Sequence, residues 1–231
     1  MTSNIDTPGS ARNLHNKLVL ITGGASGVGL ECAKHFARLG AQLLLIGRNS
    51  EKLTIACEML TKQFDVRAHS FAGDVRDSAF ANAAVAYAKN SLDCTVDVLI
   101  NNAGTIFRAH GCETEDQQWQ DVFDVNVNGV FYFSRAVANQ MTKGGAIVNI
   151  SSTCGSVGSA GLAAYCASKG AVNMLTKTMA LELAAQHINV NAVATGAINS
   201  PLLCSKHTDG TTDNSVVERN IASIPIGAIA E

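Results

Sequence analysis

The feature that most constrains the fold is a regular alternation of short apolar runs with segments of helical spacing. The apolar runs lack polar alternation, which is typical of strands buried on both faces of a sheet. The expected strands are residues 18–21, 43–46, 66–71, 96–100, 146–150 and 188–193, and the expected helices are residues 28–39, 50–63, 77–89, 116–141 and 163–185. This alternation predicts an α/β fold with a doubly wound parallel sheet of six strands.

Length and composition indicate one domain with a substantial core. The chain has 231 residues, of which 47% are hydrophobic and 16% charged, so we expect a single domain at 14–231 behind a flexible tail at 1–13. A net charge of −2 gives no electrostatic reason to expect nucleic acid or a membrane as partner. No apolar run resembles a leader or a membrane span, and the 7 cysteines lack the CxxC spacing of a zinc site. We therefore expect a cytoplasmic protein without a metal.

A glycine-rich turn, TGGASGVG at 22–29, follows the first expected strand and opens a helix. In a doubly wound sheet this turn lies at the carboxyl edge, where ligands bind, and the helix N-terminus attracts a pyrophosphate. Glycines permit close approach and positive φ angles. The turn predicts a Rossmann-like dinucleotide site, and an ordinary tight turn is the alternative. The expected contacts are Gly23, Ser26, Gly27, Val28 and Gly29.

The end of the second expected strand indicates which dinucleotide binds. An acidic residue there would bind the ribose 2′-hydroxyl of NAD, but this chain has Gly47 followed by Arg48. An arginine can pair with a 2′-phosphate through two hydrogen bonds. The sequence therefore favours NADP(H), with a solvated surface arginine as the alternative.

Two further loops should reach the same edge of the sheet. Asp74 and Val75 follow the third expected strand, where Asp74 could accept a hydrogen bond from the adenine amino group. Asn101, Ala103 and Gly104 follow the fourth, where small residues would let the cofactor lie against the backbone. Ordinary loop-closing turns are the alternative for both segments.

Tyr165 and Lys169 lie four residues apart on an expected helix and therefore share a face. Hydride transfer to a carbonyl leaves an alkoxide that needs a proton, and a tyrosine of ordinary pKa, about 10, is a poor acid or base at neutral pH. A nearby ammonium group would lower the pKa of the phenol and suit it to proton transfer. Taken alone, the pair is also typical of an exposed helix face.

Two other polar residues strengthen this interpretation. Ser152 follows the fifth expected strand at the same edge of the sheet, where its hydroxyl could polarise a substrate oxygen. Asn126 lies within an expected helix, where a buried amide is otherwise unfavourable. A role in holding a water or a backbone carbonyl in a proton relay would explain it.

In combination these motifs resemble the short-chain dehydrogenase/reductase family. The matching elements are TGGASGVG at 22–29, NNAG at 101–104, NVNG at 126–129, Ser152, and YCASK at 165–169. The resemblance implies that Ser152, Tyr165, Lys169 and Asn126 form the catalytic group and that Lys169 also binds the nicotinamide ribose. It further implies cofactor contacts by Gly196, Ile198 and Ser200. The overall pattern is most similar to oxoacyl-carrier-protein reductases and to sugar, steroid and alcohol dehydrogenases.

The chain departs from the family pattern after the sixth expected strand. It has Thr195-Gly196 where the family usually has Pro-Gly, and it ends before the usual last helix and seventh strand. We therefore expect six strands with the seventh missing and an open edge on residues 188–193. A homo-oligomer is expected, with its assembly and stability impaired by the short C-terminus.

The expected function is NADP-dependent hydride transfer between nicotinamide and a carbonyl or alcohol carbon of a small molecule. Small or apolar residues at 103–107 and at Cys154 and Gly155 favour a hydrophobic substrate, and a loop at 196–215 would complete its site. A non-catalytic or weakly active nucleotide-binding or scaffold protein on the same fold is the main alternative. Another α/β enzyme, such as a methyltransferase, would have no use for the tyrosine and lysine.

Overall fold

A computed structural model describes residues 14–142, 144–203, 218, 221–222 and 224–230. The tail expected at 1–13 and most of the loop expected at 196–215 lie outside these residues. The described strands form one parallel sheet in the order β3-β2-β1-β4-β5-β6. They are β1 (Leu18–Thr22), β2 (Gln42–Gly47), β3 (Ala68–Ala72), β4 (Val96–Asn101), β5 (Gly145–Ser152) and β6 (Ile188–Thr195). The predicted six-stranded, doubly wound, Rossmann-like sheet is confirmed.

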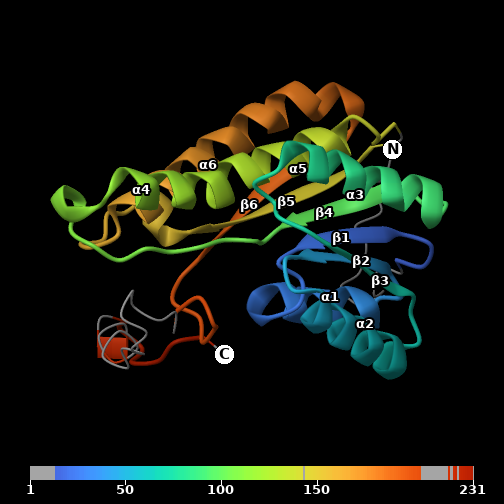
Figure 1. Cartoon of the computed structure of the whole chain (residues 1–231), viewed down its shortest axis with the longest axis horizontal. Helices are drawn as coiled ribbons and strands as arrows, with labels where there is room; N and C mark the ends of the chain where they lie inside the picture. Colours follow the sequence, from blue (N-terminus) through green and yellow to red (C-terminus); the bar gives the residue numbers. More distant parts are fainter. Residues whose placement is uncertain (1–13, 143, 204–217, 219–220, 223, 231) are drawn as a thin grey trace, which may run out of the picture.

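Helices cover both faces of this sheet (Figure 1). They are α1 (Gly27–Arg38), α2 (Ser50–Phe64), α3 (Ser78–Ser91), α4 (Asp116–Phe123), α5 (Gly129–Ala138) and α6 (Ala163–Leu183). α1 and α2 lie on one face, and α3 to α6 lie on the other. Short 3-10 turns complete the described elements: η1 (Gly111–Glu113), η3 (Thr153–Gly155) and η4 (Ala184–Gln186).

The absence of polar alternation in the strands follows from these two layers. Successive residues of a strand point to opposite faces, and both faces are covered here. Leu18 and Leu20 pack into the core beneath α3, α5 and α6. Val19 and Ile21 pack into the core beneath α1 and α2. All four are at most 1% exposed, so these four successive positions of β1 each need an apolar side chain.

Several boundaries differ from the sequence prediction. The helix expected at 116–141 is interrupted by a π-helical turn, η2 (Asp124–Asn128), between α4 and α5. Such a turn carries one extra residue, which the apolar periodicity does not reveal. α2 begins at Ser50, as expected, and Asn49 caps it, because the Asn49 Oδ1 accepts from the Lys52 N–H at 2.8 Å. β3 begins at Ala68 rather than at residue 66.

A chain of buried polar side chains ties the centre of the sheet to two helices. The Asn101 amide nitrogen donates to Ser134 Oγ and Asn149 Oδ1, each at 2.9 Å. The Asn149 amide nitrogen donates to Thr176 Oγ1 at 2.9 Å. All four residues are 5% exposed or less. These bonds therefore join β4 and β5 to α5 and α6 inside the core.

We expect Asn149→Ala to lower the free energy of unfolding by about 1–3 kcal/mol, because it leaves buried polar partners unsatisfied. Urea unfolding would measure the loss. Asn82→Ala is the matched control, since Asn82 is exposed on α3 and its change should fall within about 0.5 kcal/mol. Equal effects of the two substitutions would show that the buried chain contributes nothing specific.

Candidate active site

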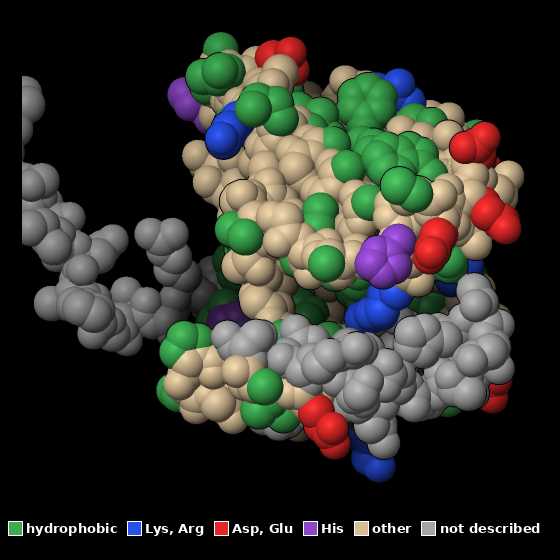
Figure 2. Space-filling model, turned by 90° about the vertical axis from the view of Figure 1, so that its left-hand side faces the viewer, with side chains coloured by type: hydrophobic (Ala, Val, Ile, Leu, Met, Phe, Trp, Pro, Cys, Tyr) green, Lys and Arg blue, Asp and Glu red, His purple; other side chains and the backbone are tan. Residues whose placement is uncertain are grey.

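A cavity of about 1460 Å³ opens at the carboxyl ends of the strands, where the chain passes to opposite sides of β1 and β4. Figure 2 shows a hollow across one side of the molecule, with Lys, Arg and His side chains at its edge. The predicted site residues that line the cavity are Gly23, Ser26, Gly27, Val28, Arg48, Asp74, Val75, Ala103, Gly104, Ser152, Tyr165, Lys169, Gly196, Ile198 and Ser200. Three predicted site residues, Gly29, Asn101 and Asn126, do not line it.

The glycine turn is held open by its own backbone and by the neighbouring strand. Gly23 and Gly27 have φ angles of +65° and +51°, which favour glycine. The Asn102 amide nitrogen donates to the Gly23 carbonyl at 3.1 Å and to the Thr22 carbonyl at 3.0 Å. A Cβ atom on Gly29 would collide with the Gly23 carbonyl oxygen. Gly29 therefore lets α1 pack against the turn rather than facing the cavity.

The start of α1 offers donors that no described side chain takes up. Ser26 is the N-cap, yet its side chain makes no capping hydrogen bond, and the first turn holds no acidic residue. Ser26, Gly27 and Val28 all line the cavity. Backbone N–H groups at a helix start, together with the helix dipole, attract anions. The turn and helix therefore fit the pyrophosphate of a dinucleotide.

Asp74 lines the end of the cavity where adenosine is expected, and Arg76 binds it there. Its Oδ2 accepts from Arg76 Nη2 at 2.7 Å and from Nε at 3.0 Å, and its Oδ1 accepts from the Arg76 N–H at 3.0 Å. Hydrogen bonds from Arg76 hold the pKa of Asp74 below its usual value, against the opposing effect of partial burial. The carboxylate thus pairs with Arg76, and its contact with adenine stays a prediction. The sequence analysis missed both Arg76 and Lys52, which line this end.

Asn101 also differs from its expected position. It ends β4, and its side chain enters the buried polar chain instead of the cavity. The next residue, Asn102, lines the cavity and holds the glycine turn. Neighbouring residues of an extended chain point to opposite sides. Asn101 therefore points into the core, and Asn102 points toward the cavity and the glycine turn.

The opposite end of the cavity brings together Ser152, Tyr165 and Lys169. Ser152 ends β5, and the two other residues lie in the first two turns of α6. The Lys169 ammonium donates to the Ile150 carbonyl at 2.7 Å and lies 5.7 Å from the centre of the Tyr165 ring. Lys169 is only 5% exposed, and this burial lowers the pKa of its amine to about 8. A buried cation beside a phenol and a hydroxyl is suited to proton transfer.

The pKa of Tyr165 is raised, whereas the sequence analysis expects Lys169 to lower it. Burial of the phenol is the largest cause, and a hydrogen bond with Ser152 opposes it. The cation that lowers the Tyr165 pKa is Arg108, a cavity residue that the sequence analysis missed. Lys169 lies over the ring of Tyr165 and donates to a backbone carbonyl, and it is not among the groups that shift the Tyr165 pKa.

Asn126 lies beneath the cavity and is fully buried in η2. Its Oδ1 accepts from the Thr105 N–H at 2.8 Å, and its amide nitrogen donates to the Thr105 carbonyl at 2.9 Å and to Ser168 Oγ at 3.0 Å. The side chain thus fixes the loop after β4 and joins it to α6. It holds a backbone carbonyl, which is one of the two contacts that the sequence suggests.

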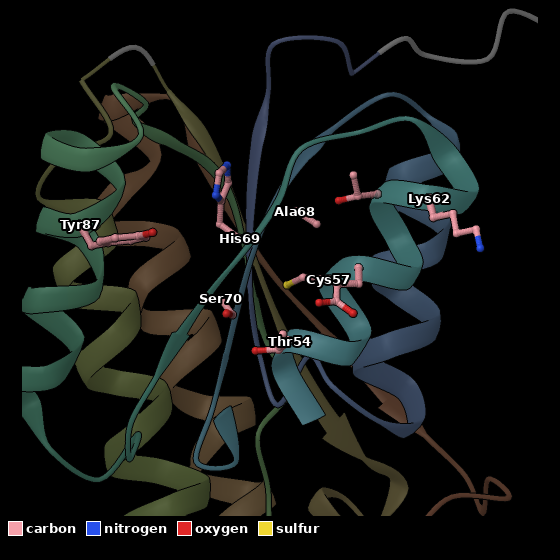
Figure 3. Close-up of a pocket in the computed structure, with 9 residues that line it drawn as sticks. Thr54, Cys57, Lys62, Ala68, His69, Ser70 and Tyr87 are labelled. Atoms are coloured by element: carbon pink, nitrogen blue, oxygen red, sulfur yellow. The ribbon is translucent and has the colours of Figure 1, made fainter. Parts of the chain in front are cut away.

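A second cavity, of about 530 Å³, lies at the β3 edge of the sheet between α2 and α3 (Figure 3). Cys57 of α2 and Ser70 of β3 face each other there, and a hydrogen bond joins their side chains. None of the predicted site residues lines this cavity. The larger cavity is therefore the candidate active site.

The described residues contain neither a metal-binding cluster nor a helix that could cross a membrane. Among them, no three His, Cys, Asp or Glu side chains gather closely enough to hold a metal ion. No described helix combines the length and the apolar character that crossing a bilayer requires.

Comparison with known proteins agrees with the fold. The family model for short chain dehydrogenase matches residues 17–210. Cyclopentanol dehydrogenase of Comamonas testosteroni is 39% identical over 191 residues, which cover 82% of this chain and 76% of that protein. 5-Keto-D-gluconate 5-reductase of Escherichia coli (strain K12) is 37% identical over 186 residues, which cover 80% and 72%.

A solved structure gives the same result. L-Sorbose reductase of Gluconobacter frateurii, complexed with NADPH and L-sorbose, superposes with a TM-score of 0.87 at 29% identity. The match covers 95% of this chain and 86% of that one. The chain therefore belongs to the short-chain dehydrogenase/reductase family of oxidoreductases.

Proposed function

We propose that this protein is an NADP(H)-dependent oxidoreductase that acts on a carbonyl or alcohol carbon of a small molecule, with Tyr165 as its proton donor and acceptor. The observation that carries the proposal is that one cavity contains both the expected catalytic residues and the expected cofactor-binding residues. One end holds Ser152, Tyr165 and Lys169, and the other holds the glycine turn and Arg48. The NADPH complex of L-sorbose reductase supports the choice of cofactor.

The adenosine end supports NADP(H) over NAD(H). Arg48 and Lys52 line this end, and Gly47 offers no carboxylate to a ribose hydroxyl. Asp74 is paired with Arg76, which leaves Arg48 and Lys52 to attract a 2′-phosphate. An arginine and a lysine near one phosphate give charge-assisted hydrogen bonds from two directions.

The catalytic end can perform the proton transfer that hydride transfer requires. Bound nicotinamide would supply the hydride in reduction and accept it in oxidation. The Ser152 hydroxyl would donate to the substrate oxygen and polarise it. Tyr165 would then give its proton to the alkoxide, which is a stronger base than a phenolate even though burial raises the pKa of the phenol.

Lys169 would orient the reactants at the same end. Its hydrogen bond to the Ile150 carbonyl fixes the ammonium group at the base of the cavity. From there the remaining N–H bonds can reach ribose hydroxyls, and the charge can support the Tyr165 phenolate when an alcohol is oxidised. A protein that only binds nucleotide would have no need of this buried cation.

We also propose that the protein is a homo-oligomer. Phe131 on α5, and Met174 and Leu181 on α6, are 37%, 60% and 82% exposed. Large apolar side chains on the outer faces of two helices are typical of a subunit interface.

Arg48→Ala should weaken NADPH binding by about 1.5–3 kcal/mol and leave NADH binding nearly unchanged, because only NADPH carries the 2′-phosphate. Titration of each cofactor by fluorescence would measure the two affinities. Arg67→Ala removes an exposed arginine outside the cavity and should change neither. Equal losses for NADPH and NADH in Arg48→Ala would contradict the proposed phosphate contact.

Tyr165→Phe should lower kcat by at least about 100-fold, because the ring remains but the transferable proton is lost. Cofactor affinity should be retained. Tyr132→Phe, which removes a hydroxyl on α5 outside the cavity, is the control and should remain active. Tyr165 would have no catalytic role if the two variants kept similar turnover.

The buried lysine predicts a specific pH dependence of stability. The pKa of Lys169 is about 8 in the folded protein and 10.5 for an ordinary lysine, so the unfolded chain binds the proton more tightly between these values. The contribution of Lys169 to the free energy of unfolding should therefore rise as the pH increases through that window. Lys169→Met should lack this rise. Parallel stability profiles of wild type and variant, from urea unfolding at each pH, would refute the buried charge.

A further inference from the structure

Two cysteines lie beside the residues of the catalytic end. Cys154 belongs to η3, two residues after Ser152, and Cys166 follows Tyr165 in the first turn of α6. Neither thiol has a part in the proposed proton transfer, and both side chains are partly buried. Among the described cysteines, Cys154 is the one that lines the larger cavity, so a small solute that enters this cavity can reach its sulfur.

The fold holds the two segments that bear these thiols against each other. The Asn173 amide nitrogen of α6 donates to the Gly155 carbonyl of η3 at 3.2 Å. A Cβ atom on Gly155 would lie 2.8 Å from the backbone of Lys169, so η3 packs directly on α6. Cys166 precedes Lys169 by three residues and therefore lies on the same side of the helix. The turn that bears Cys154 thus faces the part of α6 that bears Cys166.

The two thiols are in contact. A hydrogen bond joins the side chains of Cys154 and Cys166, and another joins the Cys154 thiol to the Ser152 side chain. The Cys154 N–H also donates to Ser152 Oγ, at 3.2 Å. The Ser152 side chain is in turn hydrogen-bonded to Tyr165. A line of contacts therefore runs from Cys166 through Cys154 to the hydroxyl that would polarise the substrate.

We propose that Cys154 and Cys166 form a redox-sensitive site, in which hydrogen peroxide converts the two thiols into a disulfide and thereby inactivates the protein reversibly. The Cys154 thiolate attacks one peroxide oxygen, which forms a sulfenic acid and releases hydroxide, and the hydroxide takes up the thiol proton as water. The Cys166 thiol then attacks the oxidised sulfur, so that the S–S bond forms and a second water leaves. The two sulfurs together lose two electrons, which the peroxide gains.

The disulfide would act on the proposed chemistry through Ser152. A covalent S–S bond is shorter than the hydrogen bond that it replaces, so Cys154 must move toward Cys166 when the bond forms. This movement displaces the contacts between Cys154 and the Ser152 hydroxyl. Since a misplacement of about 1 Å can cost about 100-fold in rate, we expect kcat to fall by at least about 10-fold. This loss of activity rests on the proposed function, whereas formation of the disulfide does not.

Mass spectrometry can detect the disulfide without an assay of activity. Burial raises the pKa of the Cys154 thiol, so little thiolate is present at neutral pH and an excess of hydrogen peroxide is needed. Trypsin would release residues 144–169 as one peptide, which contains Cys154 and Cys166 and no other cysteine or methionine. After oxidation of the folded protein, we expect this peptide to resist alkylation and to be lighter by two hydrogen atoms. Dithiothreitol should restore both thiols, and with them kcat for NADPH oxidation with a panel of ketones and aldehydes.

Cys166→Ala removes the second thiol and tests the pair. We expect it to keep the activity of the reduced protein. Peroxide should then drive Cys154 to a sulfinic acid, with a loss of activity that dithiothreitol does not reverse. Cys32→Ala is the matched control, because it removes a partly buried thiol on α1 outside the cavity. This control should lose and regain activity as the wild type does.

The possible failures are distinguishable. The redox site is overturned if the peptide of the oxidised protein keeps both thiols open to alkylation, or if Cys166→Ala recovers with dithiothreitol as fully as wild type. It is also overturned if the disulfide forms and kcat does not change. If the reduced protein oxidises NADPH with none of the carbonyl compounds, the proposed function is overturned instead, and the peptide masses alone decide whether the two cysteines form a disulfide.

Discussion

The junction between β1 and β4 is the constraint on which the rest of the structure depends. On one side the chain continues to β2 and β3, and on the other to β5 and β6, so the loops after the two central strands diverge and leave a crevice. Thr22 Oγ1 accepts from the N–H groups of Asn102 and Ala103, each at 3.0 Å. The Asn102 side chain returns a bond to the Thr22 carbonyl. These bonds lie at the floor of the crevice and fix the glycine turn relative to the loop after β4. The positions of the two ends of the cavity are therefore fixed relative to each other.

The catalytic end is built from polar groups that are costly to bury. Lys169 is held on the Ile150 carbonyl, and Asn126 uses both ends of its amide on Thr105. Each contact satisfies a buried backbone group while fixing a side chain, which preorganises the site at some expense of stability. The lowered pKa of Lys169 has the same cause, because burial disfavours the charged amine.

The sequence predicts the parts of this structure that depend on local signals. Apolar runs without alternation locate the strands, and the carboxyl-edge rule brings Ser152, Tyr165 and Lys169 to one cavity. It does not predict contacts that depend on one-residue differences. Asn101 and Asn102 are identical side chains on opposite sides of the chain, and they have different roles. The π-helical turn at Asn126 adds a residue without changing composition.

The sequence also does not predict which charged side chains meet, because this depends on the conformation of the loops. Asp74 binds Arg76, two residues away, whereas Arg108 lies near Tyr165 through a bridge between two loops. The position of Arg108 affects the catalytic end of the cavity, because its charge opposes the effect of burial on the pKa of Tyr165. Burial remains the stronger of the two effects, so this loop contact moderates the environment of the phenol and does not reverse it.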